Sequence, residues 1–192
     1  MSSDYLTNPL VFLVQVIFEL YLLVVMLRFL LQMVRADFYN PVSQFIVKAT
    51  SPVLKPFRKI IPGYGGIDFS SLVVAWLVKT VELILIIMIS GKGLMLGLPM
   101  LMAIPALVEL TINIFLFSIL IIVILSWVSP GGYNPAINLL HSLTDPVMRP
   151  ARRLLPDMGG LDLSPMLVMI GLVLLKMLLL PPLEHLAQML AF

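Results

Sequence analysis

The feature that most constrains this chain is a stretch of sequence that occurs twice. When residue n is laid on residue n + 94 from Tyr39 to Ser70, 13 of the 32 positions are identical, without a gap. So many identities indicate two copies of one unit, and we assign the first copy to residues 1–98 and the second to residues 99–192. The motif positions are Asn40, Pro41, Pro52, Pro56, Arg58, Pro62, Gly65, Gly66, Asp68 and Ser70 in the first copy, and Asn134, Pro135, Pro146, Pro150, Arg152, Pro156, Gly159, Gly160, Asp162 and Ser164 in the second.

The composition is that of an integral membrane protein. Hydrophobic residues make up 60% of the chain and charged residues 11%, and the mean hydropathy is +1.09, whereas charged residues are about a quarter of a soluble domain. We predict an all-α, polytopic protein with four transmembrane helices in two parallel tandem repeats. The spans are expected at residues 10–34, 69–90, 106–128 and 165–180. The first should remain in the mature protein, because no signal-peptide cleavage site follows it.

Between the spans, the pattern predicts short amphipathic helices in the membrane interface. Asn40 followed by Pro41 is typical of a helix start, and apolar residues recur at helical spacing after it. We expect Pro52 to end this helix, because proline lacks the backbone donor that a helix interior needs. Residues 94–104 are too few for a span and predict an interfacial or re-entrant link. Residues 183–192, which follow a pair of prolines, predict a short surface helix.

The end of the motif predicts a sharp turn and then a helix start. Gly65 and Gly66 allow the turn by which the chain re-enters the bilayer, since glycine reaches positive φ without steric cost. Asp68 and Ser70 are expected to accept hydrogen bonds from the free amides of the next helix. In the second copy, Ser164 is expected to be the helix cap, with a proline at the first helical position.

Lysine and arginine are distributed unevenly, which predicts the orientation. By the positive-inside rule, both linkers that contain the motif face the cytoplasm and both termini face out. Two spans per copy make the copies parallel, and we expect a pseudo-two-fold axis along the membrane normal to relate them. The two linkers contain Arg35, Lys48, Lys55, Arg58, Lys59, Arg149, Arg152 and Arg153, whereas the other segments outside the spans contain only Lys92.

The order Asn-Pro, Pro-x3-Pro-x-Arg, Pro, Gly-Gly and Asp-x-Ser between two apolar spans resembles the YggT family of bacterial inner-membrane proteins. That family is related to plastid proteins of the YlmG and cytochrome b6 cofactor-assembly type. The resemblance covers nearly the whole chain and implies a multi-pass protein of the bacterial inner membrane. With the orientation that the basic residues predict, both termini are expected to be periplasmic. It implies roles in osmotic-stress tolerance, membrane organisation near division or nucleoid sites, or assembly of other membrane complexes, and it implies no catalytic residue. The copies differ at Ser71, where the second has Pro165, and at Phe57, where it has Ala151.

Six basic residues of the linkers form the candidate surface sites. Either they contact anionic lipid headgroups, an attraction of about 1 kcal/mol for each basic residue, or they bind a specific partner; we favour the headgroups. Nucleic acid is not expected, because no aromatic residues interleave the charges. His141 and His185 are expected on opposite sides of the membrane and so share no metal. The six residues are Lys55, Arg58, Lys59, Arg149, Arg152 and Arg153.

Ionisable residues inside the spans are the sharpest functional signal. Charges at such depth are costly and normally face the bundle interior or a partner. Matching depths predicts one pair of Glu19 with Lys79 and another of Glu109 with Lys176, acting either as structural ion pairs between the two copies or as part of a transport site. Glu82 has no expected partner on another span, although Lys79 precedes it by three positions on its own helix.

Two functions fit these features. The first is a non-enzymatic scaffold or assembly factor that organises the inner leaflet. Its expected partners are other membrane proteins and further copies of itself. The second is a small ion or osmolyte permease that acts as an oligomer, for which the internal repeat and the intramembrane charges are the evidence. No nucleophile, phosphate-loop or cofactor motif is present in the sequence, so we expect no cofactor and no enzymatic activity.

Overall fold

The computed structural model describes residues 3–91, 93, 96–128, 134–154 and 162–191. These residues form six helices and no strand longer than an isolated bridge between Tyr64 and Ile67. The helices are α1 (Ser3–Met33), α2 (Pro41–Ile60), α3 (Phe69–Ile89), α4 (Gly97–Val128), α5 (Pro135–Leu154) and α6 (Ser164–Leu190).

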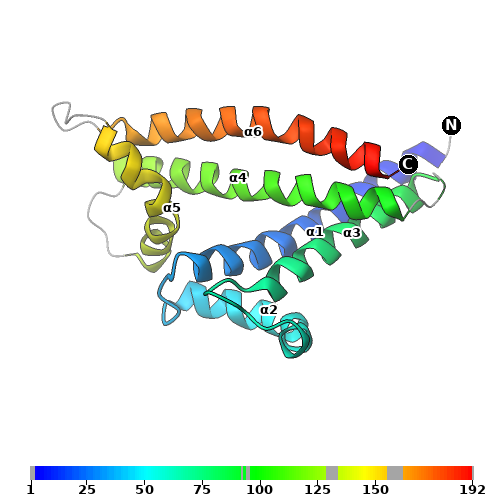
Figure 1. Cartoon of the computed structure of the whole chain (residues 1–192), viewed down its shortest axis with the longest axis horizontal. Coiled ribbons are helices and arrows are strands. Elements are labelled where there is room, and N and C mark those ends of the chain that lie inside the picture. The colour runs from blue at the N-terminus through cyan, green and yellow to red at the C-terminus, as the bar shows by residue number, and fades with distance from the viewer. Residues whose placement is uncertain (1–2, 92, 94–95, 129–133, 155–161, 192) are drawn as a thin grey trace.

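Four of the helices are long and apolar enough to cross a membrane, which confirms the prediction of four spans. The crossing segments are Thr7–Met33, Phe69–Ile89, Gly97–Val128 and Ser164–Leu190. At 1.5 Å per residue, the 32 residues of α4 reach about 48 Å, longer than a hydrocarbon core of about 30 Å, so α4 must tilt or extend beyond the core. The start of α1 and the end of α6 lie at one end of the molecule, and α5 lies at the other (Figure 1).

Several predicted helix ends were wrong for one reason: prolines lie inside these helices. Helix α2 continues through Pro52 and Pro56. Helix α4 includes Pro105, so residues 97–104 belong to the third span and not to a separate link. Helix α6 continues through Pro181 and Pro182, so the predicted tail helix is the end of the fourth span. Residues 94 and 95 of the predicted link lie outside the described residues.

Side-chain donors accompany the proline-containing part of α2. The Thr50 hydroxyl donates to the carbonyl of Ile46 at 2.7 Å, and the Ser51 hydroxyl donates to the carbonyl of Val47 at 2.5 Å. The carbonyl that Pro52 leaves without a helical donor is that of Lys48, so the two hydroxyls bond its neighbours and do not replace the lost hydrogen bond. The predicted interfacial helices are α2 and α5. Both are amphipathic as expected, but each is 20 residues long.

Asparagine caps begin both interfacial helices, as predicted for Asn40. The Asn40 side-chain oxygen accepts a hydrogen bond from the Val42 amide at 2.9 Å, and Asn134 accepts one from Ala136 at the same distance. The Asn40 side-chain amide also donates to the carbonyl of Pro135 at 2.7 Å. The first motif residue therefore both starts α2 and ties the first copy to the second.

The two copies pack against each other asymmetrically. Helix α1 packs along α3, α4 packs along α6, and the copies meet mainly where α3 lies against α4. An exact two-fold axis would also place α6 against α1, but within the described residues these two helices make no contact. The expected pseudo-two-fold arrangement is therefore not closed, and the helix pairs α1/α3 and α4/α6 cross at an angle (Figure 1).

The glycine pair makes the predicted sharp turn in the first copy. Gly65 and Gly66 have φ of 62° and 87°. The Tyr64 amide donates to the Ile67 carbonyl at 3.2 Å, and the Ile67 amide donates to the Tyr64 carbonyl at 3.0 Å. Positive φ at both central residues is the requirement of a type I′ turn. The corresponding Gly159, Gly160 and Pro156 lie outside the described residues.

Replacing Gly66 with alanine should destabilise the protein through backbone strain alone. A Cβ at this position would meet no atom within 4 Å, but the φ of +87° disfavours any L side chain, at a cost of about 1–3 kcal/mol. Gly93→Ala is the matched control, since that glycine also has open space and no positive φ. Thermal unfolding of the purified variants should show a lower midpoint for Gly66→Ala only; equal midpoints would contradict the turn argument.

Candidate functional site

An ion pair joins the end of α2 to the start of α3. The Arg58 guanidinium bonds the carboxylate of Asp68, and the same carboxylate accepts hydrogen bonds from the hydroxyls of Ser70 and Ser71, the latter at 2.6 Å. Asp68 is buried, and burial by itself would raise its pKa. The hydrogen bonds from Arg58, Ser70 and Ser71 outweigh burial and lower the pKa of Asp68 from 3.8 to about 2. The carboxylate is therefore ionised whenever the protein is near neutral pH.

The second copy repeats this pair in a more open form. Arg152 Nε lies 3.1 Å from an Asp162 carboxylate oxygen, and both side chains are about half exposed. Burial acts to raise the pKa of Asp162, but hydrogen bonds from Ser164 and Arg152 lower it overall. The spacing of Arg and Asp in the motif thus has a geometric meaning: it closes the loop between an interfacial helix and the span that follows.

The predicted helix caps were wrong at this junction. Asp68 occupies the cap position of α3 but makes no capping bond to a backbone amide, because its carboxylate is engaged by Arg58 and the two hydroxyls. In the second copy, Ser164 is the first residue of α6 and not its cap. Instead, Asp162 accepts a hydrogen bond from the Ser164 amide at 2.9 Å.

Arg28 is a functional candidate that the sequence reasoning missed. It lies in α1, is only 4% exposed, and donates to Thr50 Oγ1 at 2.6 Å, to the Val47 carbonyl at 3.1 Å and to Ser51 Oγ at 3.3 Å. An arginine inside a predicted span was itself a detectable signal. Its counterpart at n + 94 is Ile122, so only the first copy has this buried cation.

The second copy has a cavity at the place that corresponds to the Arg28 site. The cavity has a volume of about 600 Å³ and lies among α4, α5 and the start of α6. Its lining includes the apolar Ile122 and Trp127 and the polar His141, Asp145 and Arg152. The corresponding positions of the first copy lie at or near the buried core, which includes Val25, Leu54 and Ala75. The two copies therefore share a backbone plan but differ in how the space beneath the interfacial helix is filled.

The structure brings together both predicted pairs of intramembrane charges. Lys79 Nζ lies 3.7 Å from Glu19 of α1, and Lys176 Nζ lies 2.7 Å from Glu109 of α4. Each pair joins the two spans of one copy, α1 with α3 and α4 with α6. The expectation that these pairs link the two copies was therefore wrong, because the partner helices belong to the same repeat.

Each lysine also has a second partner. Lys79 Nζ lies 2.9 Å from a carboxylate oxygen of the fully buried Glu82, three positions along α3. Lys176 donates to the side-chain oxygen of Asn113 at 3.1 Å. The tightest partner of Lys79 is therefore Glu82, the residue for which no partner on another span was expected.

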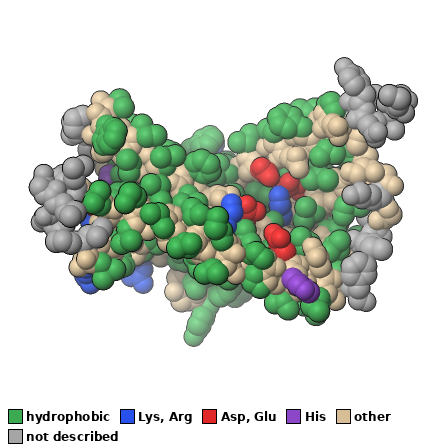
Figure 2. Space-filling model, turned by 90° about the horizontal axis from the view of Figure 1, so that it is seen from above, with side chains coloured by type: hydrophobic (Ala, Val, Ile, Leu, Met, Phe, Trp, Pro, Cys, Tyr) green, Lys and Arg blue, Asp and Glu red, His purple; other side chains and the backbone are tan. Residues whose placement is uncertain are grey.

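Part of this charge is exposed on the surface of the spans. The Glu19 side chain is 61% exposed, and those of Glu109 and Lys176 are partly exposed. On the face shown in Figure 2, acidic and basic side chains gather midway along the molecule among hydrophobic side chains. A groove of about 560 Å³ runs between α1 and α4, with Glu19 and Asn113 in its lining.

Within the described residues, three of the six predicted basic residues make ion pairs and the other three are exposed. Arg58 and Arg152 make the ion pairs described above, and Arg149 lies 2.5 Å from Asp145 within α5. Lys55, Lys59 and Arg153 are exposed, and contact of the six residues with lipid headgroups stays a prediction. No cluster of three or more potential metal ligands was found among the described residues.

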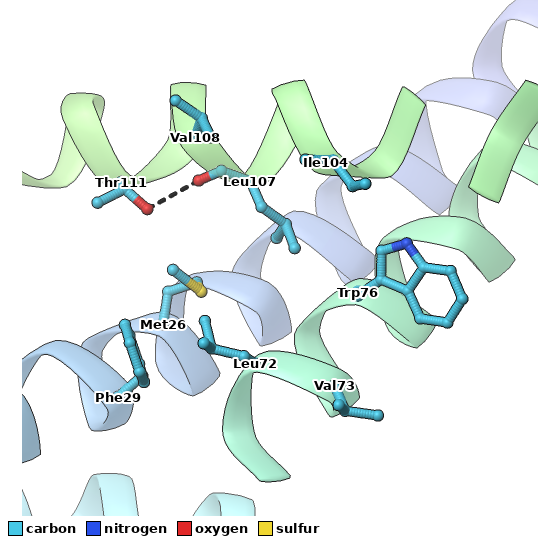
Figure 3. A pocket seen from close by; sticks show the side chains of 9 residues that line it. All are labelled: Met26, Phe29, Leu72, Val73, Trp76, Ile104, Leu107, Val108 and Thr111. Carbon is cyan, nitrogen blue, oxygen red and sulfur yellow. Dashed lines mark hydrogen bonds between the residues drawn. The ribbon is translucent and has the colours of Figure 1, made fainter. Parts of the chain in front are cut away.

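A third space lies where the two copies meet. It has a volume of about 450 Å³ and an almost wholly apolar lining from α1, α3 and α4 (Figure 3). At this contact Trp76 Nε1 donates to the carbonyl of Met100 at 2.8 Å, so the indole ties α3 to α4.

Comparison with known proteins identifies the family. A model of the CCB3/YggT family matches residues 7–89 and again residues 101–183. The chain belongs to the CCB3/YggT family. It is 47% identical over 175 residues to a Pseudomonas aeruginosa protein, covering 90% of this chain and 89% of that one. It is 41% identical over 172 residues to Escherichia coli K12 YggT, with 88% of each chain covered.

Both of these CCB3/YggT relatives are named as uncharacterized proteins. No solved structure matches the chain. The two matched segments correspond to the two repeats, so each copy of the family unit contains two spans, one interfacial helix and one Arg–Asp junction.

Removing the Asp68 carboxylate should cost stability in a pH-dependent way. The lowered pKa corresponds to about 2 kcal/mol. Because the folded pKa lies below the ordinary 3.8, this stabilisation is present above that pH and is lost as the pH falls toward about 2. Unfolding measured for the parent and Asp68→Asn should therefore differ near neutral pH and converge in acid. Asp162→Asn, at the half-exposed junction, should lose less stability than Asp68→Asn. A loss of stability in Asp68→Asn that does not change with pH would contradict the electrostatic account.

Removing Lys79 should be far more damaging than removing Glu19. Lys79→Met leaves the buried Glu82 without its cation, a loss of about 3–5 kcal/mol. Adding Glu82→Gln should restore much of the stability, whereas adding Glu19→Leu should restore little, since Glu19 is exposed and farther from the lysine. Thermal unfolding of the single and double variants measures the coupling. Better rescue by Glu19→Leu would reverse the assignment of the main partner.

Proposed function

We propose that this protein is a non-enzymatic membrane scaffold or assembly factor that binds other membrane proteins through its intramembrane charged face. The observation that carries the proposal is the position and exposure of Glu19. It lies near the middle of the Thr7–Met33 span and is 61% exposed. A carboxylate at that depth cannot remain against lipid tails without a large cost, since ionisable side chains in spans normally face protein or water.

The second copy supports the same interpretation. Glu109 and Lys176 also lie near the middle of their spans, Gly97–Val128 and Ser164–Leu190, and are partly exposed. Contact with lipid tails would desolvate both groups at a cost in free energy, whereas a polar partner helix could satisfy their remaining hydrogen-bonding capacity. A face with charge at mid-depth in both copies is better matched to a protein partner than to lipid.

The interfacial helices give the proposal its second part. Both end in a basic turn, with Arg58 and Lys59 in α2 and Arg152 and Arg153 in α5. Basic side chains at the ends of amphipathic helices favour anionic headgroups of the cytoplasmic leaflet. We propose that both linkers face the cytoplasm and both termini the periplasm of a bacterial inner membrane, so the protein would organise the inner leaflet while it holds a partner within the bilayer.

The proposal is tested by partner recovery from intact membranes. Tagged parent and Glu19→Gln proteins are extracted in mild detergent, and co-purifying membrane proteins are quantified by mass spectrometry. We expect a defined set of partners with the parent and a several-fold loss with Glu19→Gln, because the amide keeps the side-chain shape but removes the charge. Glu184→Gln is the control, since it removes a carboxylate near the end of α6, away from the middle of the span.

Two results would overturn this function. One is a partner set that does not depend on Glu19. The other is cation or osmolyte flux in proteoliposomes of the parent that Glu82→Gln abolishes without loss of folded protein, which would favour a permease that acts as an oligomer.

A further inference from the structure

The contact between the two copies is made by one face of α3 and one face of α4. Leu72, Val73 and Trp76 line the space at this contact on the α3 side, and Ile104, Leu107, Val108 and Thr111 line it on the α4 side (Figure 3). The α4 residues follow the spacing i, i+3, i+4 and i+7, which places them on one stripe of the helix. The Trp76 indole adds a hydrogen bond to the Met100 carbonyl across the contact.

The repeat shows which faces correspond to this contact. Moving by 94 positions takes α3 onto α6 and carries α4 back onto α1. The counterparts of Leu72 and Trp76 are Met166 and Ile170, and both are exposed on α6, at 55% and 51%. The chain therefore has a second copy of the α3 face whose counterparts of Leu72 and Trp76 are about half exposed.

Helix α1 has the complementary face. The counterparts of Leu107 and Thr111 are Leu13 and Ile17, which are exposed at 54% and 64%. With Leu10 and Val14 they form the same i, i+3, i+4 and i+7 stripe on α1. Because α6 and α1 of one chain make no contact, neither face can satisfy the other within a single molecule.

We infer that α6 of one molecule packs against α1 of a second copy, in the way that α3 packs against α4 inside each chain. The occupant is a second copy because the chain itself already contains this helix contact, with the same stripe on each side. Exposed apolar residues alone do not drive association in lipid, so close packing is needed. Gly171 provides for close packing: it follows Ile170 on the α6 face, and no atom lies within 4 Å of the position of its Cβ.

The resulting contact is head-to-tail. Each molecule has one α6 face and one α1 face, and the two are different surfaces. Such heterologous contacts form a closed ring when the rotation allows it and an open row otherwise. The inference comes from internal packing alone and is independent of the partner-binding proposal, so either can fail without the other.

Disulfide crosslinking in membranes tests this contact, because the natural chain contains no cysteine. Molecules with Leu13→Cys and molecules with Met166→Cys, the counterparts of Leu107 and Leu72, carry different tags and are expressed together, and the membranes are then oxidised. We expect a crosslinked dimer with both tags, several-fold more abundant than either homodimer. Leu72→Cys with Leu107→Cys in one chain is the reference for the internal contact.

Phe12→Cys with Met166→Cys is the matched control. Phe12 is 63% exposed, and it lies one residue from Leu13 but about 100° farther round α1, away from the stripe of Leu10, Leu13, Val14 and Ile17. Equal mixed dimer from this pair would show random collision and overturn the inference. A predominant Leu13→Cys homodimer would overturn it in favour of a symmetric contact. No mixed dimer, with the internal reference crosslinked, would show that lipid or another protein covers these faces.

Discussion

The Arg–Asp ion pair is the interaction on which each repeat depends. An interfacial helix and a transmembrane helix must meet at a steep angle, and the loop between them is short and contains glycine. Arg58 and Asp68 hold the two helix ends together across that loop, and Ser70 and Ser71 complete the carboxylate's hydrogen bonds. Without the pair, the buried Asp68 carboxylate would lack a cation at the apolar end of the span, which is destabilising, so Arg58 has a structural role besides any contact with headgroups.

The two copies share this junction but differ in the space beneath the interfacial helix. In the first copy, Arg28 fills the space beneath α2 and bonds to Thr50 and the neighbouring carbonyl, which leaves a closed core. In the second copy, Ile122 replaces the arginine and a cavity remains beside His141 and Arg152. The exchange of arginine for isoleucine is one of several differences in the residues that line this space in the two copies.

The sequence was sufficient for the features that follow from periodicity and composition. Four spans, the glycine turn at Gly65 and Gly66, and the pairing of Lys79 and Lys176 with acidic residues of neighbouring helices followed from hydropathy, φ preference and depth. Proline was weighted too strongly, because the local rule counts only the lost backbone donor, whereas α2 continues through Pro52 and Pro56 and buries Leu54 between them. The open arrangement of the copies was also out of reach, since a repeat specifies the unit but not the rotation between units.

The buried and exposed charges have different consequences for assembly. Glu82 and Lys79 neutralise each other inside the first copy, so this pair presents no net charge to a neighbouring molecule. Glu19 adds a second carboxylate near the same lysine but stays exposed, which leaves the α1 side with negative charge that its own chain does not fully compensate. A molecule with that charge near the middle of one span, and with unmatched apolar stripes on α1 and α6, is incomplete as a monomer in lipid. The proposed membrane-protein partner would cover the charge on α1, and the inferred second copy would cover the apolar stripes.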